Sequence, residues 1–213
     1  MQTAVSRASK ALGSSLIYWI VPIAIVVIWQ FLVEIEVIPA RMLPAPTEIV
    51  GAAWKLITSG ELPGNVWVST QRALIGLAIG GGIGFALGLL NGLVPVGEKL
   101  LDTTVQMIRT IPHLALVPLV ILWFGVGETA RIFLIALGVF FPLYLNTFHG
   151  VRYVDEGLIE MGRVYGLSRW ELFRQVIFPG ALPSILIGLR YALGIMWLTL
   201  IVSETIAARQ GIG

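Results

Sequence analysis

The sequence predicts an all-α protein, a polytopic bundle of transmembrane helices. Of its 213 residues 57% are hydrophobic and only 12% are charged, and the mean hydropathy is +0.89. A soluble domain is about 45–50% apolar and about 25% charged. The charges also gather between long stretches that carry none, whereas a water-exposed surface needs them along the whole chain. Both observations place the chain in a lipid bilayer.

Net charge and cysteine content exclude several other classes of protein. The formal net charge is +2 and the pI is about 9.2, but the 14 lysines and arginines are spread over many loops. They form no continuous basic stripe of the kind that binds nucleic acid. The chain has no cysteine, which excludes disulfide scaffolds, thiolate metal sites and thiol catalysis.

Five apolar runs, four of them uncharged and the fifth interrupted by Arg190, are predicted to cross the bilayer within a single permease domain, residues 1–213. The first run, 11–33, reaches roughly 34 Å as a helix, enough for a hydrocarbon layer about 30 Å thick. Basic residues before it also resemble a secretory signal, but the apolar part of a signal holds about 7–15 residues, which favours an uncleaved anchor. The other runs are 73–97, 110–127, 132–151 and 181–203.

The distribution of basic residues predicts that the N-terminus lies in the cytoplasm. Cytoplasmic segments carry the excess of Lys and Arg in membrane proteins. With this orientation the cytoplasmic segments contain Arg7, Lys10, Lys99, Arg109, Arg152, Arg163, Arg169 and Arg174, and the outer segments contain Arg41, Lys55, Arg72, Arg131 and Arg209. In the outer segment after the first span, prolines flank a short apolar stretch, 49–57, which we expect to form an interfacial helix.

Glycines recur at every fourth position of the second span and so line one ridge of a helix. Such small residues let a second backbone approach closely. We therefore expect a tight helix crossing there, and the same ridge also suits a sliding surface in a conformational change. The glycines are Gly76, Gly80, Gly84, Gly88 and Gly92.

The cytoplasmic segment 152–180 is predicted to form a helical hairpin. A first short helix over 158–165 ends at Gly166, the residue best suited to a left-handed C-terminal turn. Ser168 and Glu171 have the spacing of a capping box, so a second helix begins at Arg169 and runs towards Pro179. The exposed apolar side chains of such a hairpin suit a groove on a protein partner.

The hairpin carries Glu160-Met161-Gly162, then Gly166, then Val176-Ile177-Phe178-Pro179. This resembles the EAA loop of binding-protein-dependent ABC importer permeases, which reads Glu-Ala-Ala, three residues, Gly, nine residues, Ile, one residue, Leu-Pro. Every spacing fits. Met161 and Gly162 replace the two alanines, and Val176 and Phe178 replace Ile and Leu, which affects only the fine packing.

Other segments are similar to the nitrate/sulfonate/taurine branch of these permeases, and most closely to its aliphatic sulfonate permeases. The resemblance implies a permease subunit that carries an aliphatic sulfonate across the plasma (inner) membrane; taurine, nitrate or another anion is the alternative. That family has a further helix beyond the end of this sequence, so we expect a truncated sixth span. The segments are Leu43-Pro44-Ala45-Pro46, Leu101-Asp102-Thr103-Thr104, Ile111-Pro112-His113, Leu122-Trp123-Phe124-Gly125 and Met196-Trp197-Leu198-Thr199.

The resemblance also implies partners: two ATP-binding subunits, a periplasmic substrate-binding protein and a second permease copy. The loop docks on the ATPase, whose closure rocks the two permeases between inward-open and outward-open states. Glu160, Gly162 and Gly166 hold the loop in the family. We expect Arg163, Arg169 and Trp170 to touch the ATPase, in a hairpin shaped by Ser168, Glu171 and Pro179.

No nucleotide site is expected in this chain. A Gly-x-x-x-x-Gly-Lys-Ser/Thr loop is absent from the sequence, so ATP and Mg²⁺ are expected on the ATP-binding partner. The segment 125–130 reads Gly-x-Gly-x-x-Ala, which is similar to a dinucleotide fingerprint, but no βαβ pattern surrounds it. It is interpreted as a turn between two spans.

Arg190 lies about 14 Å along the fifth span, near the middle of the bilayer. Two hypotheses stay open for it: it lines the route of an anionic sulfonate, or it bonds to helix-end carbonyl groups. His113 and His149 lack nearby carboxylates and are expected to be hydrogen-bonding groups at helix ends, with no metal site.

Two other classes of function compete with the importer. A secondary transporter or channel would work without an ATPase. An intramembrane enzyme would depend on His113 or Asp102, but no set of nucleophile, base and acid is visible in the sequence. We therefore expect a subunit without catalytic activity of its own.

Overall fold

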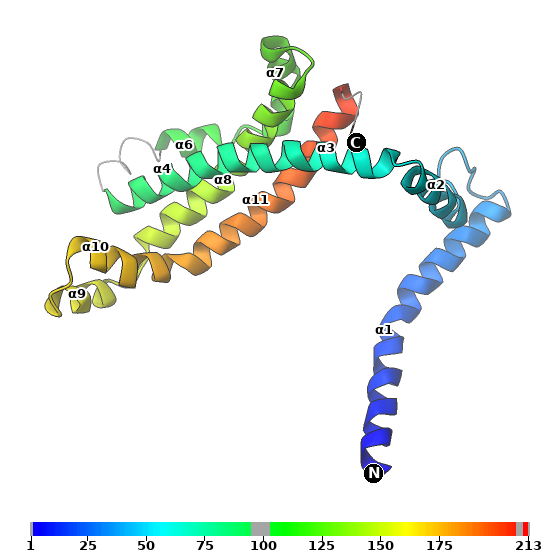
Figure 1. Cartoon of the computed structure of the whole chain (residues 1–213), viewed down its shortest axis with the longest axis horizontal. Helices are drawn as coiled ribbons and strands as arrows, with labels where there is room; N and C mark the ends of the chain where they lie inside the picture. Colours follow the sequence, from blue (N-terminus) through cyan, green and yellow to red (C-terminus); the bar gives the residue numbers. More distant parts are fainter. Residues whose placement is uncertain (1, 95–102, 208–210, 213) are drawn as a thin grey trace. The chain divides into compact units, whose positions relative to one another are not determined.

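The computed structural model describes residues 2–94, 103–207 and 211–212. Within these residues the chain is helical and forms no strand, so the predicted all-α class is confirmed (Figure 1). The chain divides into two compact units, residues 1–63 and 64–213, which are described separately. A single permease domain over 1–213 therefore stays a prediction.

The first unit consists of two helices, α1 (Gln2–Glu34) and α2 (Pro46–Thr58). Pro46 occupies the first turn of α2, where a residue without an N–H group suits a helix, and Glu48 accepts a hydrogen bond from the Ala45 N–H (3.3 Å). Gln30 joins the two helices because its Oε1 accepts from the Thr47 N–H (3.2 Å). The apolar stretch 49–57 is thus helical, and its place at a membrane interface stays a prediction.

The second unit contains three long helical runs and a hairpin. The first run joins α3 (Glu61–Gly76), a π-helical segment (Leu77–Gly81) and α4 (Gly82–Leu93). Shorter elements follow, and then a second long helix. They are α6 (Thr103–Ile108), a 3₁₀ turn (His113–Leu116), α7 (Val117–Phe124) and α8 (Glu128–Arg152). The hairpin consists of α9 (Glu156–Val164) and α10 (Arg169–Leu172). A π-helical segment (Phe173–Ile177) and the third long helix, α11 (Phe178–Ala207), follow.

Four helical runs in the described residues are long and apolar enough to span a membrane: Ile17–Glu34, Glu61–Leu93, Glu128–Arg152 and Arg169–Thr205. The described residues thus contain four runs of spanning length, and the five crossings expected from the sequence stay a prediction. The predicted third span, 110–127, contains a shorter apolar helix, His113–Phe124, which reaches only about 18 Å. Pro112, in an extended conformation, precedes this helix, and Gly125 at φ +73° ends it.

The chain still passes from one end of the second unit to the other between α4 and α8. Arg72 in α3 bonds to Glu128 at the start of α8 (2.6 Å). Gly92, near the end of α4, packs against Val151 near the end of α8. The segment between Leu93 and Glu128 therefore brings the chain back to the end of the unit from which α3 started, as a five-pass topology requires. The described part of this segment contains no helix of spanning length.

The long helices begin earlier or end later than the uncharged runs predict. Arg72, Glu128, Arg131 and Glu204 were taken to bound the spans, yet all four lie inside helices. They are tolerated there because they bond to one another, as described below. The end of the second predicted span, 95–97, lies outside the described residues.

The second helix of the hairpin begins at Arg169, as predicted, and continues without a break through Pro179 and Pro183 into α11. The π-helical segment Phe173–Ile177 directly precedes Phe178 and Pro179. A π turn widens the helix and so relieves the clash and the missing hydrogen bond that proline otherwise causes. The second arm of the hairpin, α10, and the last long helix, α11, are consequently continuous (Figure 1).

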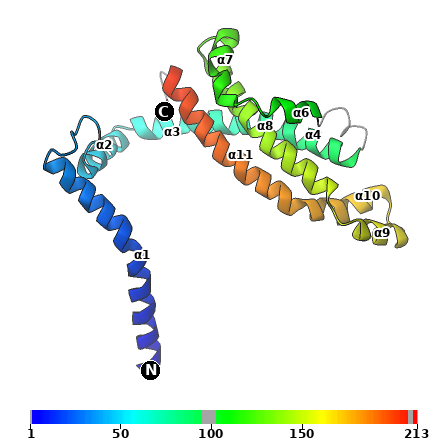
Figure 2. The same ribbon diagram turned by 180° about the vertical axis from the view of Figure 1, so that it is seen from behind.

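Helix α8 lies at the centre of the second unit and packs against α4 and α11 (Figures 1 and 2). The five regularly spaced glycines face α8 so closely that no side chain fits. A Cβ atom on Gly84 would lie 2.5 Å from the Phe140 carbonyl oxygen, and one on Gly88 would lie 2.5 Å from that of Tyr144. Gly76 faces Ile135, Gly80 faces Ala136 and Gly92 faces Val151. The glycine ridge is therefore a backbone-to-backbone crossing.

Candidate functional site

Helix α9 begins at Asp155, a cap that the sequence analysis did not recognise. Its Oδ1 accepts hydrogen bonds from the backbone N–H groups of Gly157 (2.7 Å) and Leu158 (3.3 Å), which otherwise lack partners at a helix start. The helix thus starts at Glu156, before the predicted start at residue 158.

Gly166 ends α9 in the left-handed conformation, at φ +78°. The Leu167 N–H donates to the Gly162 carbonyl (3.1 Å), and the Gly166 N–H donates to that of Arg163 (3.0 Å). This closing turn satisfies carbonyl groups at the helix end and reverses the chain within two residues.

Ser168 and Glu171 form the capping box that their spacing predicts. The Glu171 N–H donates to Ser168 Oγ (3.3 Å), and the Ser168 N–H donates to Glu171 Oε2 (2.8 Å). Two N–H groups at the start of α10 are thereby satisfied reciprocally, which fixes the angle at which α10 leaves the turn.

Gly162 lets the two arms of the hairpin touch. It is buried, and a Cβ atom there would lie 2.7 Å from Leu172 Cδ1. Leu172 in α10 is itself buried. The two capped arms therefore pack on each other and form a stiff hairpin.

The outer surface of the hairpin is apolar and exposed. Val164 is 87% exposed and Trp170 is 67% exposed, and Trp170 stacks on Phe173 with ring centroids 5.6 Å apart. Arg163 and Arg169 are also exposed. An apolar knob edged by guanidinium groups is typical of a surface that a protein partner covers.

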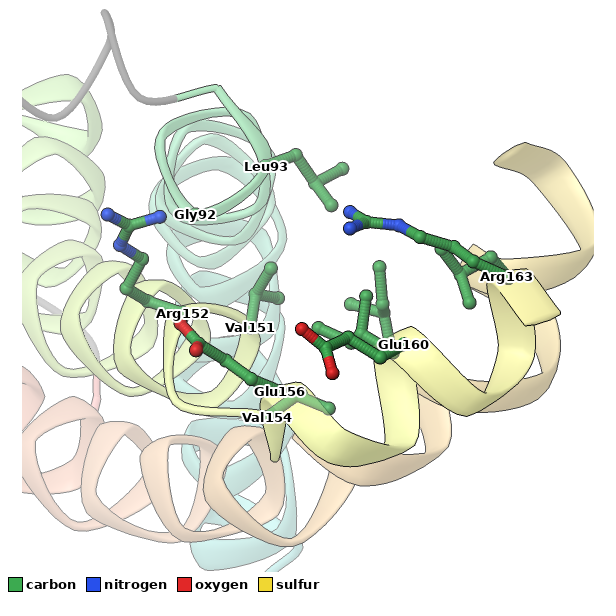
Figure 3. A pocket seen from close by; sticks show the side chains of 11 residues that line it. Gly92, Leu93, Val151, Arg152, Val154, Glu156, Glu160 and Arg163 are labelled. Carbon is green, nitrogen blue, oxygen red and sulfur yellow. The ribbon is translucent and has the colours of Figure 1, made fainter. Parts of the chain in front are cut away.

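A hollow of about 440 Å³ lies between α9 and the neighbouring ends of α4 and α8 (Figure 3). Glu160 and Arg163 of α9 lie on one side of it, and Glu156, at the start of α9, lies beside Arg152 of α8 on the other side (Figure 3). The predicted contact residues thus divide between two surfaces: Arg163 lines the hollow, whereas Arg169 and Trp170 stand on the exposed hairpin. Pro179 is exposed at the start of α11.

A cluster of charges, in which Arg72 and Glu204 are buried and Glu128 is exposed, lies at the opposite end of α8, and the sequence analysis missed it. Arg72 holds Glu128 through Nε and Nη2 (both 2.6 Å) and Glu204 through Nη1 (2.6 Å). Ser69 Oγ donates to Glu204 Oε1 (2.7 Å), and Arg131 Nη1 donates to Glu128 Oε1 (2.9 Å). Glu204 is 1% exposed. One network therefore ties α3, α8 and α11 together.

Arg190 is exposed on α11, and the structure contains no hydrogen bond or ion pair between it and any other described residue. The bond to helix-end carbonyl groups that one hypothesis requires is thus not formed within the described part of this chain.

His113 has the expected hydrogen-bonding contact, whereas the buried Nδ1 of His149 has no hydrogen-bond partner among the described residues. His113 Nε2 lies 3.0 Å from Thr199 Oγ1, and the ring of His149 stacks on Tyr153. Within the ranges that the structure describes, no group of three or more His, Asp or Glu side chains could hold a metal ion. Asp102, which the enzyme hypothesis invoked, lies outside the described residues.

Residues 78–213 match the family described as binding-protein-dependent transport system inner membrane component. The chain belongs to this family. It is 57% identical to the putative aliphatic sulfonates transport permease protein SsuC of Escherichia coli, over 92% of this chain and 74% of that protein. It is 46% identical to the Bacillus subtilis protein of the same name, over 91% and 70%.

Two further comparisons broaden this relationship. The taurine transport system permease protein TauC of Escherichia coli is 35% identical, over 87% of this chain and 70% of that protein. An amino acid ABC transporter structure has the same fold, with a TM-score of 0.54 and 20% identity over 74% of this chain and 77% of the other. The chain is thus a multi-pass inner membrane permease of an ABC importer, as the EAA-like spacing indicated.

Proposed function

We propose that this chain carries an aliphatic sulfonate across the inner membrane and is driven by ATP-binding subunits that dock on the α9–α10 hairpin. The observation that carries the proposal is the hairpin itself, which is capped at both arms, closed by Gly166 and apolar on its exposed surface. A contact that transmits force has to be stiff, and a contact with a protein has to offer apolar area.

The same proposal includes the other components of the transporter. Two copies of the permease form the translocation unit, a periplasmic binding protein delivers the substrate, and ATP and Mg²⁺ bind to the ATPase partner. The N-terminus lies in the cytoplasm, because the hairpin has to be on that side and an even number of passes, the four predicted before residue 152, separates the two. The hollow beside Glu160 and Arg163 lies next to the docking surface, where a side chain of the ATPase can enter it.

The proposed substrate class is supported by the names of the relatives. Two relatives at 57% and 46% identity are named for aliphatic sulfonates, whereas the relative named for taurine is 35% identical. Taurine is itself a short sulfonate with an added amino group, so it stays the second candidate.

The test of the proposal compares three variants of the full protein in cells that lack their own permease for sulfonates. The cells supply the ATPase and the binding protein, and growth uses an alkanesulfonate as sole sulfur source. Glu160→Lys and Gly166→Pro are expected to abolish co-purification of the ATPase and growth. Glu61→Lys makes the same charge change on an exposed residue of the outer segment and is expected to leave both intact.

Growth that survives both hairpin variants without any ATPase would support the secondary transporter instead. Wild-type protein that binds the ATPase yet supports growth only on taurine, or on another anion, would overturn the sulfonate assignment and leave the importer standing.

A further inference from the structure

Helix α11 has two contrasting faces. One face is buried in the second unit, where Ala192, Met196 and Leu200 pack into the same core as Ile135 of α8. The other face is exposed and apolar, and it carries Arg190 at its centre. The exposed residues nearest to Arg190 on this face are Leu186, Ile187, Leu193 and Gly194.

Arg190 is far from either end of the spanning helix. It lies about 24 Å along the helix from Arg174 and about 21 Å from Glu204. A guanidinium group at this depth is unfavourable in lipid and normally faces water, a partner or a ligand. Because it bonds to no other described residue, its counterpart is not in the described part of this chain.

The surroundings of Arg190 fit an amphiphilic anion. Gly194 stands one turn further along the helix, and a Cβ atom there would meet nothing within 4 Å. This leaves open space beside the guanidinium group. The turn on its other side presents the aliphatic side chains of Leu186 and Ile187. The guanidinium group of Arg190 can donate two parallel hydrogen bonds to an anionic head group, and the aliphatic surface beside it suits an alkyl tail.

We infer that Arg190 binds the sulfonate group of the substrate inside the membrane, with the alkyl chain lying against Leu186 and Ile187. The inference rests on the proposed function and deepens it by naming the residue that recognises the anion. The exposed face of α11 then borders the translocation path rather than lipid, which explains why a charge is retained there.

Cysteine labelling tests whether this face meets water and substrate. The chain contains no cysteine, so Arg190→Cys creates its single thiol. The probe is sulfonatoethyl methanethiosulfonate, a water-soluble reagent that is itself a sulfonate, applied to the complete transporter in proteoliposomes. We expect Arg190→Cys to react and an alkanesulfonate delivered by its binding protein to slow the reaction about tenfold. Ile79→Cys, exposed at the middle of the first long run, is the lipid-facing control and is expected to stay unlabelled.

Transport measurements with Arg190→Gln and Arg190→Lys provide the second test. The loss of a charge-assisted hydrogen bond predicts at least about tenfold slower sulfonate transport for Arg190→Gln. The Lys variant retains part of the rate, and aminoethyl methanethiosulfonate restores part of it to Arg190→Cys. ATP hydrolysis stimulated by the loaded binding protein, and co-purification of the ATPase, stay unchanged in all three. Arg41→Gln removes one positive charge from an exposed loop and is the control.

The outcomes separate the inference from the function on which it rests. If wild-type protein transports sulfonates but Arg190→Gln does so equally well, or labelling of Arg190→Cys is not slowed by substrate, the inference is wrong and the function stands. If Arg190→Gln loses its ATPase partner, Arg190 is a structural tie and the inference is also wrong. If the wild-type transporter moves no sulfonate, both are wrong.

Discussion

Two regions at opposite ends of α8, the hairpin and the charge cluster, are both built from polar contacts. The contacts differ in how far apart the bonded residues lie in the sequence. In the hairpin, Ser168 bonds to Glu171, three residues away. In the cluster, Ser69 bonds to Glu204 from the opposite end of the unit's sequence. The hairpin bonds are also exposed to solvent, whereas Arg72 and Glu204 are buried. Local exposed bonds shape one element, and distant buried bonds hold three helices together.

The charge cluster is where a substitution is expected to have the largest effect. Glu204→Gln removes the negative charge that Arg72 faces and leaves a buried cation incompletely paired, which costs about 3–5 kcal/mol. Thermal unfolding of the purified protein in detergent micelles measures this loss. Glu61→Gln, on an exposed residue, is expected to leave stability within about 0.5 kcal/mol. If Glu61→Gln lost as much stability as Glu204→Gln, the assay would not report on the ion pair between Arg72 and Glu204.

The glycine crossing is the next most sensitive place. Gly84→Leu inserts a side chain where even a Cβ atom would lie 2.5 Å from the Phe140 carbonyl oxygen, so α4 and α8 have to separate. Overpacking of this kind costs about 1–3 kcal/mol. Gly82→Leu is the matched control two residues earlier, because a Cβ atom on Gly82 would meet nothing within 4 Å. Equal melting temperatures of the two variants would contradict the crossing.

A smaller effect is expected at the turn of the hairpin. Gly166→Ala keeps the volume almost unchanged but places a Cβ atom on a residue at φ +78°, which costs about 1–2 kcal/mol. The loss falls on the hairpin alone, so hydrogen exchange of peptides covering 156–172 is expected to quicken while the exchange of α8 stays constant. Gly51→Ala in α2 lacks this strain and is expected to be neutral or slightly stabilising.

The smallest effect is expected at the capping box. Ser168→Ala removes the acceptor of the Glu171 N–H and costs about 1 kcal/mol, confined to the first turn of α10. Hydrogen exchange of the amide of Glu171 measures it, and Ser168→Thr, which keeps the hydroxyl, is expected to restore protection. A global loss of stability in Ser168→Ala would show that the hairpin is coupled to the bundle more tightly than its local bonds suggest.

The same difference in reach explains which features could be predicted from the sequence. The cap at Ser168, the turn at Gly166 and the glycine ridge depend on residues within a few positions of one another, and their spacing indicates them directly. Asp155 was missed because its helix begins with polar residues that hide the start of the periodicity. A cap residue followed by Glu156 was the available signal.

The charge cluster could not be predicted, because charges were used to mark the ends of the spans. Arg72, Glu128 and Glu204 each looked like a boundary, and only the three-dimensional structure shows that they neutralise one another. The predicted orientation contained a hint, since it places Arg72 on the outer side, and Glu128 and Glu204 directly follow the third and fifth predicted spans, which end on that side. The shorter helix within the predicted third span has a different cause, because Pro112 and Gly125 limit the helix between them to a few turns.

The continuity of α10, the π-helical segment and α11 has a mechanical consequence. Trp170 and Arg190 lie on the same continuous helix, about 30 Å apart along its axis. A tilt imposed at the hairpin end of this helix displaces its middle sideways, and the π-helical segment Phe173–Ile177 lies between the two. The displacement at Arg190 therefore depends on the rigidity of the π-helical segment. A substitution that stiffens this segment would change the displacement and leave Trp170 and Arg190 themselves unaltered.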